Sequence, residues 1–140
     1  MKLLEQRQRL RDKYSSAAVE GKEAEIAHSE EDLRFLGKVV DAIHYLMPRK
    51  ETDVNTMASR MFMSSRQFHR KMLTLTGETP AAYILRIKIR KSQQLLDSTP
   101  GMAFTEVAER SGFEDYSVFT RSFRKVVGLT PTQYVRGAGE

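Results

Sequence analysis

Apolar residues recur at steps of three and four along most of this chain, which is the pattern of amphipathic helices. The first clear stripe starts near Asp32 and runs through Leu33, Leu36, Val40, Ile43, Leu46 and Met47. Pro48 follows it directly and predicts the end of that helix. No run of six residues alternates cleanly between apolar and polar, so the sequence predicts no strand. The pattern indicates an all-α fold.

Capping residues divide the next part of the chain into three helices. Asp53 is a good N-cap for a short helix that ends at Arg60, and Ser64 caps the helix after it. Gly77 suits the left-handed position at the end of that second helix. A Thr-Pro pair then supplies the N-cap and first-turn proline of a long helix over about 81–97. Two short helices around a tight turn are typical of a helix-turn-helix module.

The second half of the chain repeats this order. Residues 57–84 and 107–135 are two versions of one segment, and an offset of 50 places Ala58 and Arg60 on Ala108 and Arg110. An offset of 51 places Phe68, Arg70, Gly77, Thr79, Pro80 and Tyr83 on Phe119, Arg121, Gly128, Thr130, Pro131 and Tyr134. A repeat of this length is one supersecondary unit used twice. We therefore expect seven helices, arranged as two homeodomain-like helix-turn-helix modules joined by a long central helix.

The repeat also sets the expected domain boundaries. Residues 1–31 start with a short helical pattern and continue as a polar, acidic stretch, so we expect a helical linker or connector there. We expect the tandem helix-turn-helix domain over 32–136, with module one at 32–80, the central helix at 81–97 and module two at 103–136.

The charge of the chain is concentrated beside the repeat. The formal net charge is +5, and residues 1–40 are neutral with eight basic and eight acidic groups. Residues 64–95 hold seven basic residues against one acidic residue, Glu78. A local excess of this kind on helices favours a polyanionic partner. Together with the tandem modules, it predicts binding of double-stranded DNA.

The sequence shows no constellation that would carry catalysis. The chain has no cysteine and only three histidines, which lie far apart. It contains no HExxH, Gly-rich phosphate loop or Gly-x-Ser-x-Gly motif. We expect no enzyme, no metal site, no cofactor and no small-molecule ligand in this segment. No stretch approaches eighteen apolar residues, and the lack of cysteine fits a reducing cytosol, so we expect a cytoplasmic location.

The candidate site residues lie on the second helix of each module. In a helix-turn-helix this helix occupies the major groove, and its first turns face the base edges. The outward residues there are expected to contact bases: Arg66, Gln67, His69 and Arg70 in module one, and Tyr116, Ser117, Thr120 and Arg121 in module two. Arginine can bridge O6 and N7 of guanine, and glutamine can pair with adenine. Phosphate contacts are expected from Ser64, Lys71, Lys88, Arg124 and Lys125.

Two other roles for these residues stay open at this point. A basic helix face is often only solvated, and it then has no partner at all. Arg70 and Arg121, which are equivalent in the repeat, could instead tie their helices to neighbours through salt bridges.

The second copy carries a motif pattern that identifies a family: Val107-Ala108, Gly112-Phe113, Ser117-x-Phe119, Arg121-x-Phe123-Arg124, Gly128-x-Thr130-Pro131 and Tyr134. In these residues the sequence resembles the AraC/XylS family of bacterial transcription regulators, over roughly residues 32–136. The first copy shares Ala58, Met63-Ser64, Phe68, Arg70, Gly77 and Tyr83. Lys88 and Ser92 depart from the family pattern, which usually has Arg and Ala there. Ala103 also leaves the first helix of module two without a side-chain cap.

The resemblance implies that the two recognition helices enter successive major grooves on one face of DNA. It implies a transcription activator that contacts RNA polymerase. The opening LLEQRQRLRDKY resembles the linker that follows a receiver domain in hybrid two-component regulators. We therefore expect a fragment, the output end of a larger signalling protein, and one candidate for that protein is a membrane-anchored hybrid sensor with this cytoplasmic part at its C-terminal end.

Two alternatives remain from the sequence. The chain could be a small free-standing regulator that forms a homodimer through residues 1–30. It could also be a protein-interaction module whose helices dock on RNA polymerase or another partner with little DNA contact.

Overall fold

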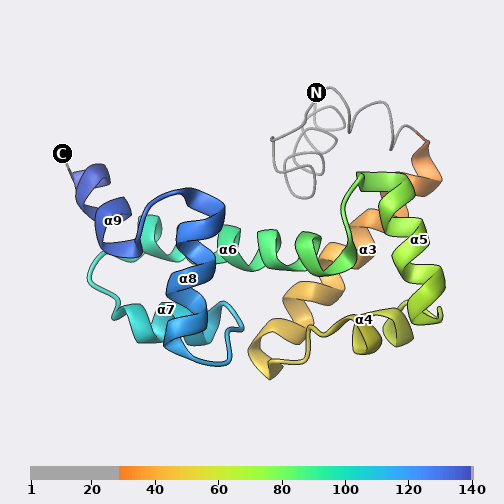
Figure 1. The fold of residues 1–140 in the computed structure, drawn as a ribbon, viewed down its shortest axis with the longest axis horizontal. Helices are drawn as coiled ribbons and strands as arrows, with labels where there is room; N and C mark the ends of the chain where they lie inside the picture. The colour runs from red at the N-terminus through yellow and green to blue at the C-terminus, as the bar shows by residue number, and fades with distance from the viewer. Residues whose placement is uncertain (1–28, 140) are drawn as a thin grey trace.

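The computed structural model describes residues 29–139, and this part of the chain is entirely helical (Figure 1). It contains seven α-helices and one short 3-10 helix: α3 (Glu30–Leu46), η1 (Met47–Arg49), α4 (Val54–Arg60), α5 (Ser65–Thr76), α6 (Pro80–Ser98), α7 (Phe104–Arg110), α8 (Tyr116–Val127) and α9 (Pro131–Gly139). No strand occurs within these residues, which confirms the all-α prediction. The expected N-terminal connector and the possible dimer contact through 1–30 lie almost wholly outside the described residues.

Helix α3 begins slightly before the apolar stripe because its cap lies upstream. The Ser29 hydroxyl accepts a hydrogen bond from the backbone N–H of Asp32 at 3.0 Å. Three acidic residues then occupy the first turn, where the positive end of the helix dipole stabilises them. Helix α3 ends at Leu46, as Pro48 predicts, and Pro48 itself lies in η1 directly after it.

Helix α6 belongs to both modules, because its buried residues lie in two separate cores. The Thr79 hydroxyl caps it, and Pro80 occupies its first position. Its 19 residues span about 28 Å at a rise of about 1.5 Å each. The first core takes Tyr83, Ile84 and Ile87 from α6, whereas the second takes Ile89 and Leu96.

The two cores are built from different side chains. The first is mainly aliphatic and methionine-rich and includes Leu36, Val39, Val40, Ile43, Met47, Met57, Phe68 and Met72. The second contains a chain of aromatic contacts, in which Phe113, Phe119, Phe123 and Tyr134 follow one another at centroid distances of 5.4, 5.7 and 5.5 Å. The Tyr134 hydroxyl donates to Asp97 at 3.0 Å and so fastens α9 to the end of α6. Burial and this bond to Asp97 raise the pKa of Tyr134.

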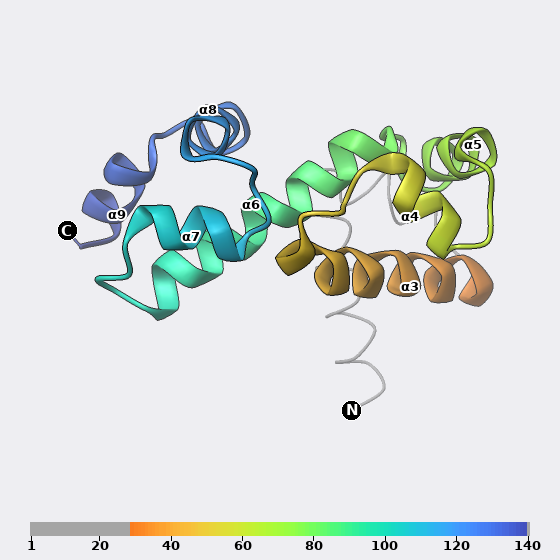
Figure 2. The ribbon, with the colours of Figure 1, turned by 90° about the horizontal axis from the view of Figure 1, so that it is seen from below.

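The second helices of the two modules lie on the same side of the molecule. In Figure 1, α5 and α8 both run across the direction of α6, one near each of its ends. Figure 2, turned by 90°, shows both helices nearly end-on along one edge, with α3 along the opposite edge. The fold therefore presents two parallel helices on one face.

Candidate nucleic-acid interface

The first helix-turn-helix consists of α4, residues 61–63 and α5. Asp53 caps α4 by accepting hydrogen bonds from the Thr56 N–H and hydroxyl, which lower the pKa of its carboxyl group. The turn is closed by backbone bonds from Phe62 N–H to Ser59 and from Met63 N–H to Ala58, at 3.0 and 2.9 Å. Phe62 adopts a left-handed conformation with φ of 60°. This turn directs α5 across α4.

Helix α5 buries one side and exposes the other. Phe68, Met72 and Leu75, which follow one another at steps of four and three, lie in the first core. The opposite side carries four exposed residues that were expected to contact bases: Arg66, Gln67, His69 and Arg70. Within residues 29–139, Arg66 and Arg70 form no ion pair, so the salt-bridge alternative for Arg70 has no support in this structure. Their guanidinium groups face solvent at the start of the helix.

Gln67 has a structural partner that the sequence interpretation missed. Its side-chain oxygen accepts from the Ser64 N–H at 3.0 Å, while the Ser64 hydroxyl accepts from the Gln67 N–H at 3.1 Å. This reciprocal pair is a capping box, and the Ser-x-x-Gln spacing at the start of a helix is its sequence signal. Base contact by Gln67 and phosphate contact by Ser64 stay predictions. Each would have to coexist with these bonds or replace them.

Lys71 is on the side of α5 that faces α3. Its ammonium group is 4.5 Å from the centroid of the Phe35 ring, a cation–π arrangement. Lys71 as a whole is half-buried. Phosphate contact by Lys71 stays a prediction, and it would require the side chain to swing away from Phe35.

The second helix-turn-helix consists of α7, the turn at 111–114 and α8. Asp115 caps α8 by accepting from the Val118 N–H at 2.9 Å and from the Ser117 hydroxyl at 3.1 Å. These bonds, the backbone one first, lower the pKa of Asp115, and the nearby Arg121 adds to the effect. Ala103 provides no side-chain cap for α7, as expected from the sequence.

The outward face of the first turns of α8 is less basic than that of the first turns of α5. Tyr116, Ser117 and Arg121 are exposed, and Thr120 is half-buried with its hydroxyl donating to the Ser117 carbonyl. Arg121 forms no ion pair among the described residues. Arg124 and Lys125 are exposed in the last turn, where cations also favour the helix dipole. Five of the six residues predicted on α8 are therefore exposed, and Thr120 is half-buried.

Lys88 lies away from both recognition helices. Its ammonium group stacks on the Phe113 ring at 4.5 Å, at the junction of the two modules. Burial lowers the pKa of Lys88, and the negative charge of Glu114 partly opposes that effect. Phosphate contact by Lys88 stays a prediction, but the structure gives this side chain a role between the modules.

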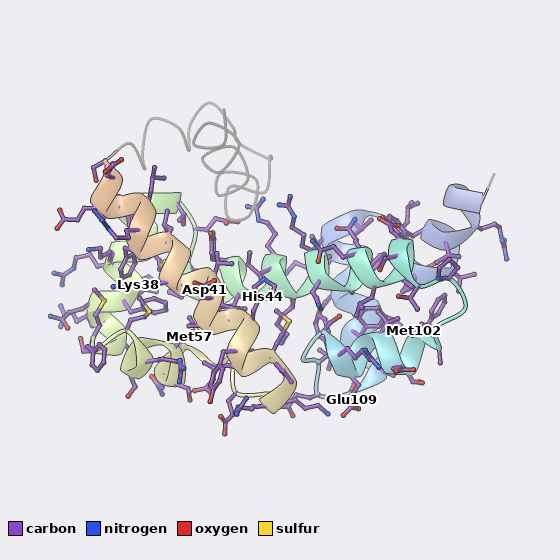
Figure 3. The ribbon with its side chains drawn as sticks, turned by 180° about the vertical axis from the view of Figure 1, so that it is seen from behind. Lys38, Asp41, His44, Met57, Met102 and Glu109 are labelled. Carbon is purple, nitrogen blue, oxygen red and sulfur yellow. The ribbon has the colours of Figure 1, made fainter. Side chains whose placement is uncertain are left out.

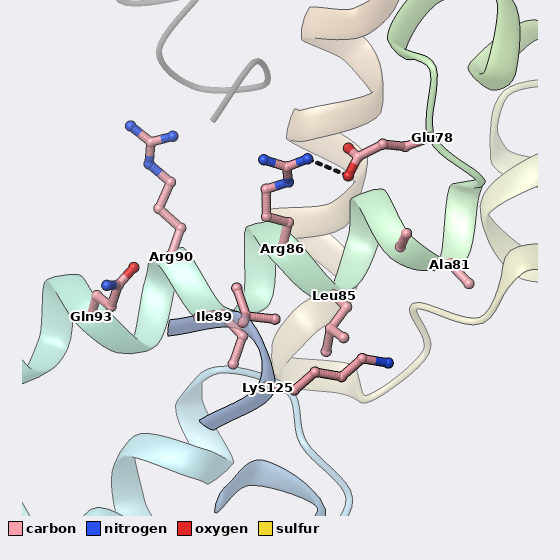
Figure 4. A pocket seen from close by; sticks show the side chains of 10 residues that line it. Glu78, Ala81, Leu85, Arg86, Ile89, Arg90, Gln93 and Lys125 are labelled. Atoms are coloured by element: carbon pink, nitrogen blue, oxygen red, sulfur yellow. Dashed lines mark hydrogen bonds and ion pairs between the residues drawn. The ribbon is translucent and has the colours of Figure 1, made fainter. Parts of the chain in front are cut away.

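A groove of about 840 Å³ lies along α6 between the ends of α5 and α8 (Figure 4). Leu85 and Ile89 contribute apolar surface, and Arg86, Arg90 and Lys125 contribute cations. Arg86 is paired with Glu78, and the other two cations form no ion pair among the described residues. The sequence interpretation did not place Arg86 or Arg90 in the interface. Their spacing of four on α6 was the available signal.

The described residues hold no group of three or more His, Cys, Asp or Glu side chains placed to bind a metal ion. Among the same residues, no helix is both long enough and apolar enough to cross a lipid bilayer. The chemistry that this surface offers is recognition by guanidinium, hydroxyl and aromatic groups on two parallel helices.

A family model described as "Helix-turn-helix domain" matches residues 57–137, more than half of the chain and both modules. The chain belongs to the AraC-type helix-turn-helix family of transcription regulators. The fold and the family are those of DNA-binding regulators, in agreement with the resemblance seen in the sequence. The homeodomain-like tandem arrangement is confirmed by solved structures of the same kind.

Three similar proteins illustrate the match. The DNA-binding domain of AdpA, solved in complex with a target DNA, is 31% identical with a TM-score of 0.65, covering 72% of this chain and 89% of that one. The C-terminal domain of the two-component response regulator yesN from Fusobacterium nucleatum is 24% identical with a TM-score of 0.65, covering 71% and 95%. Histidine kinase P4 from Formosa agariphila is 28% identical over 132 residues, covering 94% of this chain and 10% of that protein.

The chain is short compared with its curated relatives. It spans between a tenth and about a third of the length of those that it matches. The similarity therefore concerns one part of these longer proteins.

Proposed function

We propose that this AraC-type chain binds double-stranded DNA sequence-specifically, with α5 and α8 occupying two successive major grooves on one face of the duplex. The observation that carries the proposal is the parallel placement of these two helices on one side of the molecule (Figures 1 and 2). Exposed Arg66 and Arg70 on α5 and Arg121 on α8 supply the donors that base recognition needs. The likeness to the AdpA domain, solved with its target DNA, supports the same use of the surface.

The groove along α6 fits this arrangement. Successive major grooves on one face of DNA are one turn apart, about 34 Å. A duplex that contacts both α5 and α8 would pass along α6, which lies between them (Figure 1). Arg86, Arg90 and Lys125 line that space and would face the sugar-phosphate backbone. The DNA-binding unit would then comprise module one at 32–80, the central helix and module two at 103–136, with α6 contributing contacts of its own.

We further propose that the chain is the output part of a two-component signalling protein that activates transcription through RNA polymerase. The likeness to histidine kinase P4 covers 94% of the chain and so extends well beyond the helix-turn-helix modules into residues 1–28. Because the similarity to this protein, which is named as a histidine kinase, covers so much of the chain, it supports a linker common to both proteins as well as a common DNA-binding part. A cytoplasmic location follows from the proposal, since the DNA and the polymerase are there.

The first test measures binding to duplex DNA over a range of salt concentrations. If about six to eight phosphates are neutralised, the plot of log K against log salt should have a slope of about −5 to −7. A pure protein-interaction module would instead show no retardation of random duplex at low salt, and a slope near zero would exclude the DNA proposal. Selection from a random duplex library should then recover two conserved half-sites.

A second test addresses the phase between the modules. One alanine inserted near Gln93 should rotate module two by about 100° relative to module one. The variant should keep near-normal helicity yet bind the full site with the affinity of a single module. Unchanged affinity for the full site would show that the two recognition helices do not act as one unit.

A further inference from the structure

A direct contact joins the two modules in addition to α6. The turn between α7 and α8 packs on the C-terminal end of α3 and on η1. At its centre is Gly112, where a Cβ atom would lie 2.8 Å from the Met47 side chain and 2.9 Å from the Met47 carbonyl oxygen. Both residues are buried. A side chain at position 112 therefore fits only if the turn or the backbone at Met47 shifts.

Charged side chains surround this contact. The Lys50 ammonium and the Glu109 carboxylate form an ion pair of 3.3 Å that joins module one to module two. The Lys88 ammonium lies over the Phe113 ring in the same region. Figure 3 shows Glu109 on α7 beside the end of α3. The contact, the ion pair and the stacked lysine together make up what we call the junction: Met47, Lys50, Lys88, Glu109, Gly112 and Phe113.

The first module shows that the turn itself does not demand glycine. Phe62 occupies the position equivalent to Gly112 and has φ of 60°, compared with 82° at Gly112. The two turns also share their backbone bonds, with the N–H of Phe62 bonded to Ser59 and that of Gly112 bonded to Glu109. Phe62 is 95% exposed, so nothing packs on it. The shape of the turn alone therefore does not exclude a side chain at position 112, whereas the close approach to Met47 leaves no room for one.

We propose that the junction fixes the orientation of α8 relative to α5 and thereby sets the spacing between half-sites that the chain accepts. In this arrangement Gly112 and Met47 are positioning residues for DNA recognition, although neither lies on a recognition helix. The proposal rests on the proposed DNA-binding function for its second half only, because the orientation can be measured without DNA. The junction connects the modules a second time, from η1 to the turn after α7, in addition to the covalent connection through α6. Two connections resist bending of α6 between the modules.

The orientation can be tested in the free protein by measuring the distance between spin labels on the two recognition helices. The chain has no cysteine, so Thr74→Cys and Val126→Cys, both at exposed positions, place one label on α5 and one on α8. The parent should give one narrow distance distribution, and Gly112→Ala should give a broader or shifted one. Gly101→Ala is the matched control, because Gly101 also has a positive φ, of 92°, but has nothing within 4 Å of its Cβ position. Identical distributions for the two alanine variants would overturn the proposal.

A second pair of variants keeps the test valid if Gly112→Ala does not fold. Lys50→Glu places two carboxylates together at the junction, on side chains that are exposed enough to leave the cores intact. This single variant should broaden the distribution of distances between the two labels. The double variant Lys50→Glu/Glu109→Lys re-forms the ion pair with reversed charges and should restore the narrow distribution. Failure of the single change to alter the distribution, or of the double variant to restore it, would count against the junction.

The DNA half of the proposal is tested with duplexes in which the half-site spacing is changed by one or two base pairs. The parent and Gly101→Ala should prefer one spacing, and Gly112→Ala should lose about tenfold on that spacing while binding a single half-site within about threefold of the parent. The DNA half of the proposal would be overturned if Gly112→Ala broadened the label distances but kept the parent's preference for half-site spacing. If no variant binds any duplex, the proposed function fails, and the spin-label result still decides whether the junction fixes the orientation.

Discussion

The two helix-turn-helix modules share one backbone plan but fill it with different side chains. Both place a short helix, a tight turn with a left-handed residue and a recognition helix in the same order. Module one surrounds Phe68 with aliphatic and methionine side chains, whereas module two surrounds Phe119 with other aromatic rings. The outward residues differ as well, with two arginines and a histidine on α5 and mainly hydroxyl-bearing residues on α8. A repeated scaffold can therefore carry two different recognition surfaces.

The difference between the cores predicts different responses to a truncated aromatic side chain. Phe119→Ala should destabilise the protein by about 3–5 kcal/mol, because the ring is completely buried and its aromatic neighbours are rigid. Phe68→Ala should cost less than Phe119→Ala, because the surrounding methionines can adopt new rotamers and fill part of the cavity. Urea unfolding followed by circular dichroism measures both. Equal losses would mean that the methionine-rich core adapts no better than the aromatic one.

The difference between the recognition surfaces predicts separate footprints on DNA. Arg66→Ala or Arg70→Ala should cost about 1–3 kcal/mol of binding free energy and relax specificity only in the half-site under α5. Arg121→Ala should do the same only in the other half-site. Competition binding with single-base-pair variants of the selected site measures each effect. Equal weakening on every sequence would instead assign that arginine to a phosphate, and loss of helicity would make it structural.

Much of this architecture could be predicted from the sequence, because local signals and tertiary packing agree. Asp53 and Ser64 cap helices in the structure as the sequence predicts, and Gly77 adopts the left-handed conformation at the end of α5. The inward positions of Phe68 and Phe119 follow from helical periodicity. These features depend on short-range geometry, which the sequence encodes directly.

The caps of the two recognition helices differ in their response to acid. In α5 the capping box of Ser64 and Gln67 has no titratable group, whereas α8 depends on the carboxylate of Asp115. The pKa of Asp115 lies below its ordinary value of 3.8, so its stabilising contribution is full above that value and is lost as pH falls through the lowered pKa. Ser64→Ala should therefore cost about 1 kcal/mol at any pH, while the cost of Asp115→Ala should vanish in acid.

Urea unfolding at neutral pH and at a series of acid values measures this difference. The amide resonance of Val118 should shift with the titration of Asp115, while that of Gln67 should not shift with it. An Asp115→Ala cost that persists at the lowest pH would show that the protonated side chain caps α8 as well as the carboxylate does.

The features that the sequence did not reveal are those that depend on contacts between distant residues. Gly112 looks like an ordinary turn glycine until its approach to Met47, 65 positions earlier, is seen. Lys88 belongs to a basic run on α6, yet it stacks on Phe113 instead of facing solvent. The sequence does not single out Arg90, because periodicity does not show which side of α6 faces the space between the modules. Tertiary geometry alone decides these roles.

The smallest predicted effect concerns the turn residues that distinguish the modules, Phe62 and Gly112. A left-handed conformation costs a non-glycine residue about 1 kcal/mol or more. Phe62→Gly removes that strain and loses no packing, because the ring is 95% exposed. The extra freedom of glycine in the unfolded chain opposes the gain by about 0.4–1 kcal/mol. A net stabilisation of roughly a few tenths of a kcal/mol should remain, visible as a higher urea midpoint at constant slope.

Phe62→Ala is the matched control for this change, because it removes the ring but keeps a Cβ atom in the left-handed conformation. Its urea midpoint should therefore not rise, and the difference between the two variants isolates the backbone strain. If Phe62→Gly instead lowers the midpoint by more than Phe62→Ala does, glycine's freedom in the unfolded chain outweighs the strain. The left-handed turn would then cost this protein little, and the absence of a side chain at position 112 would have the contact with Met47 as its only remaining physical reason.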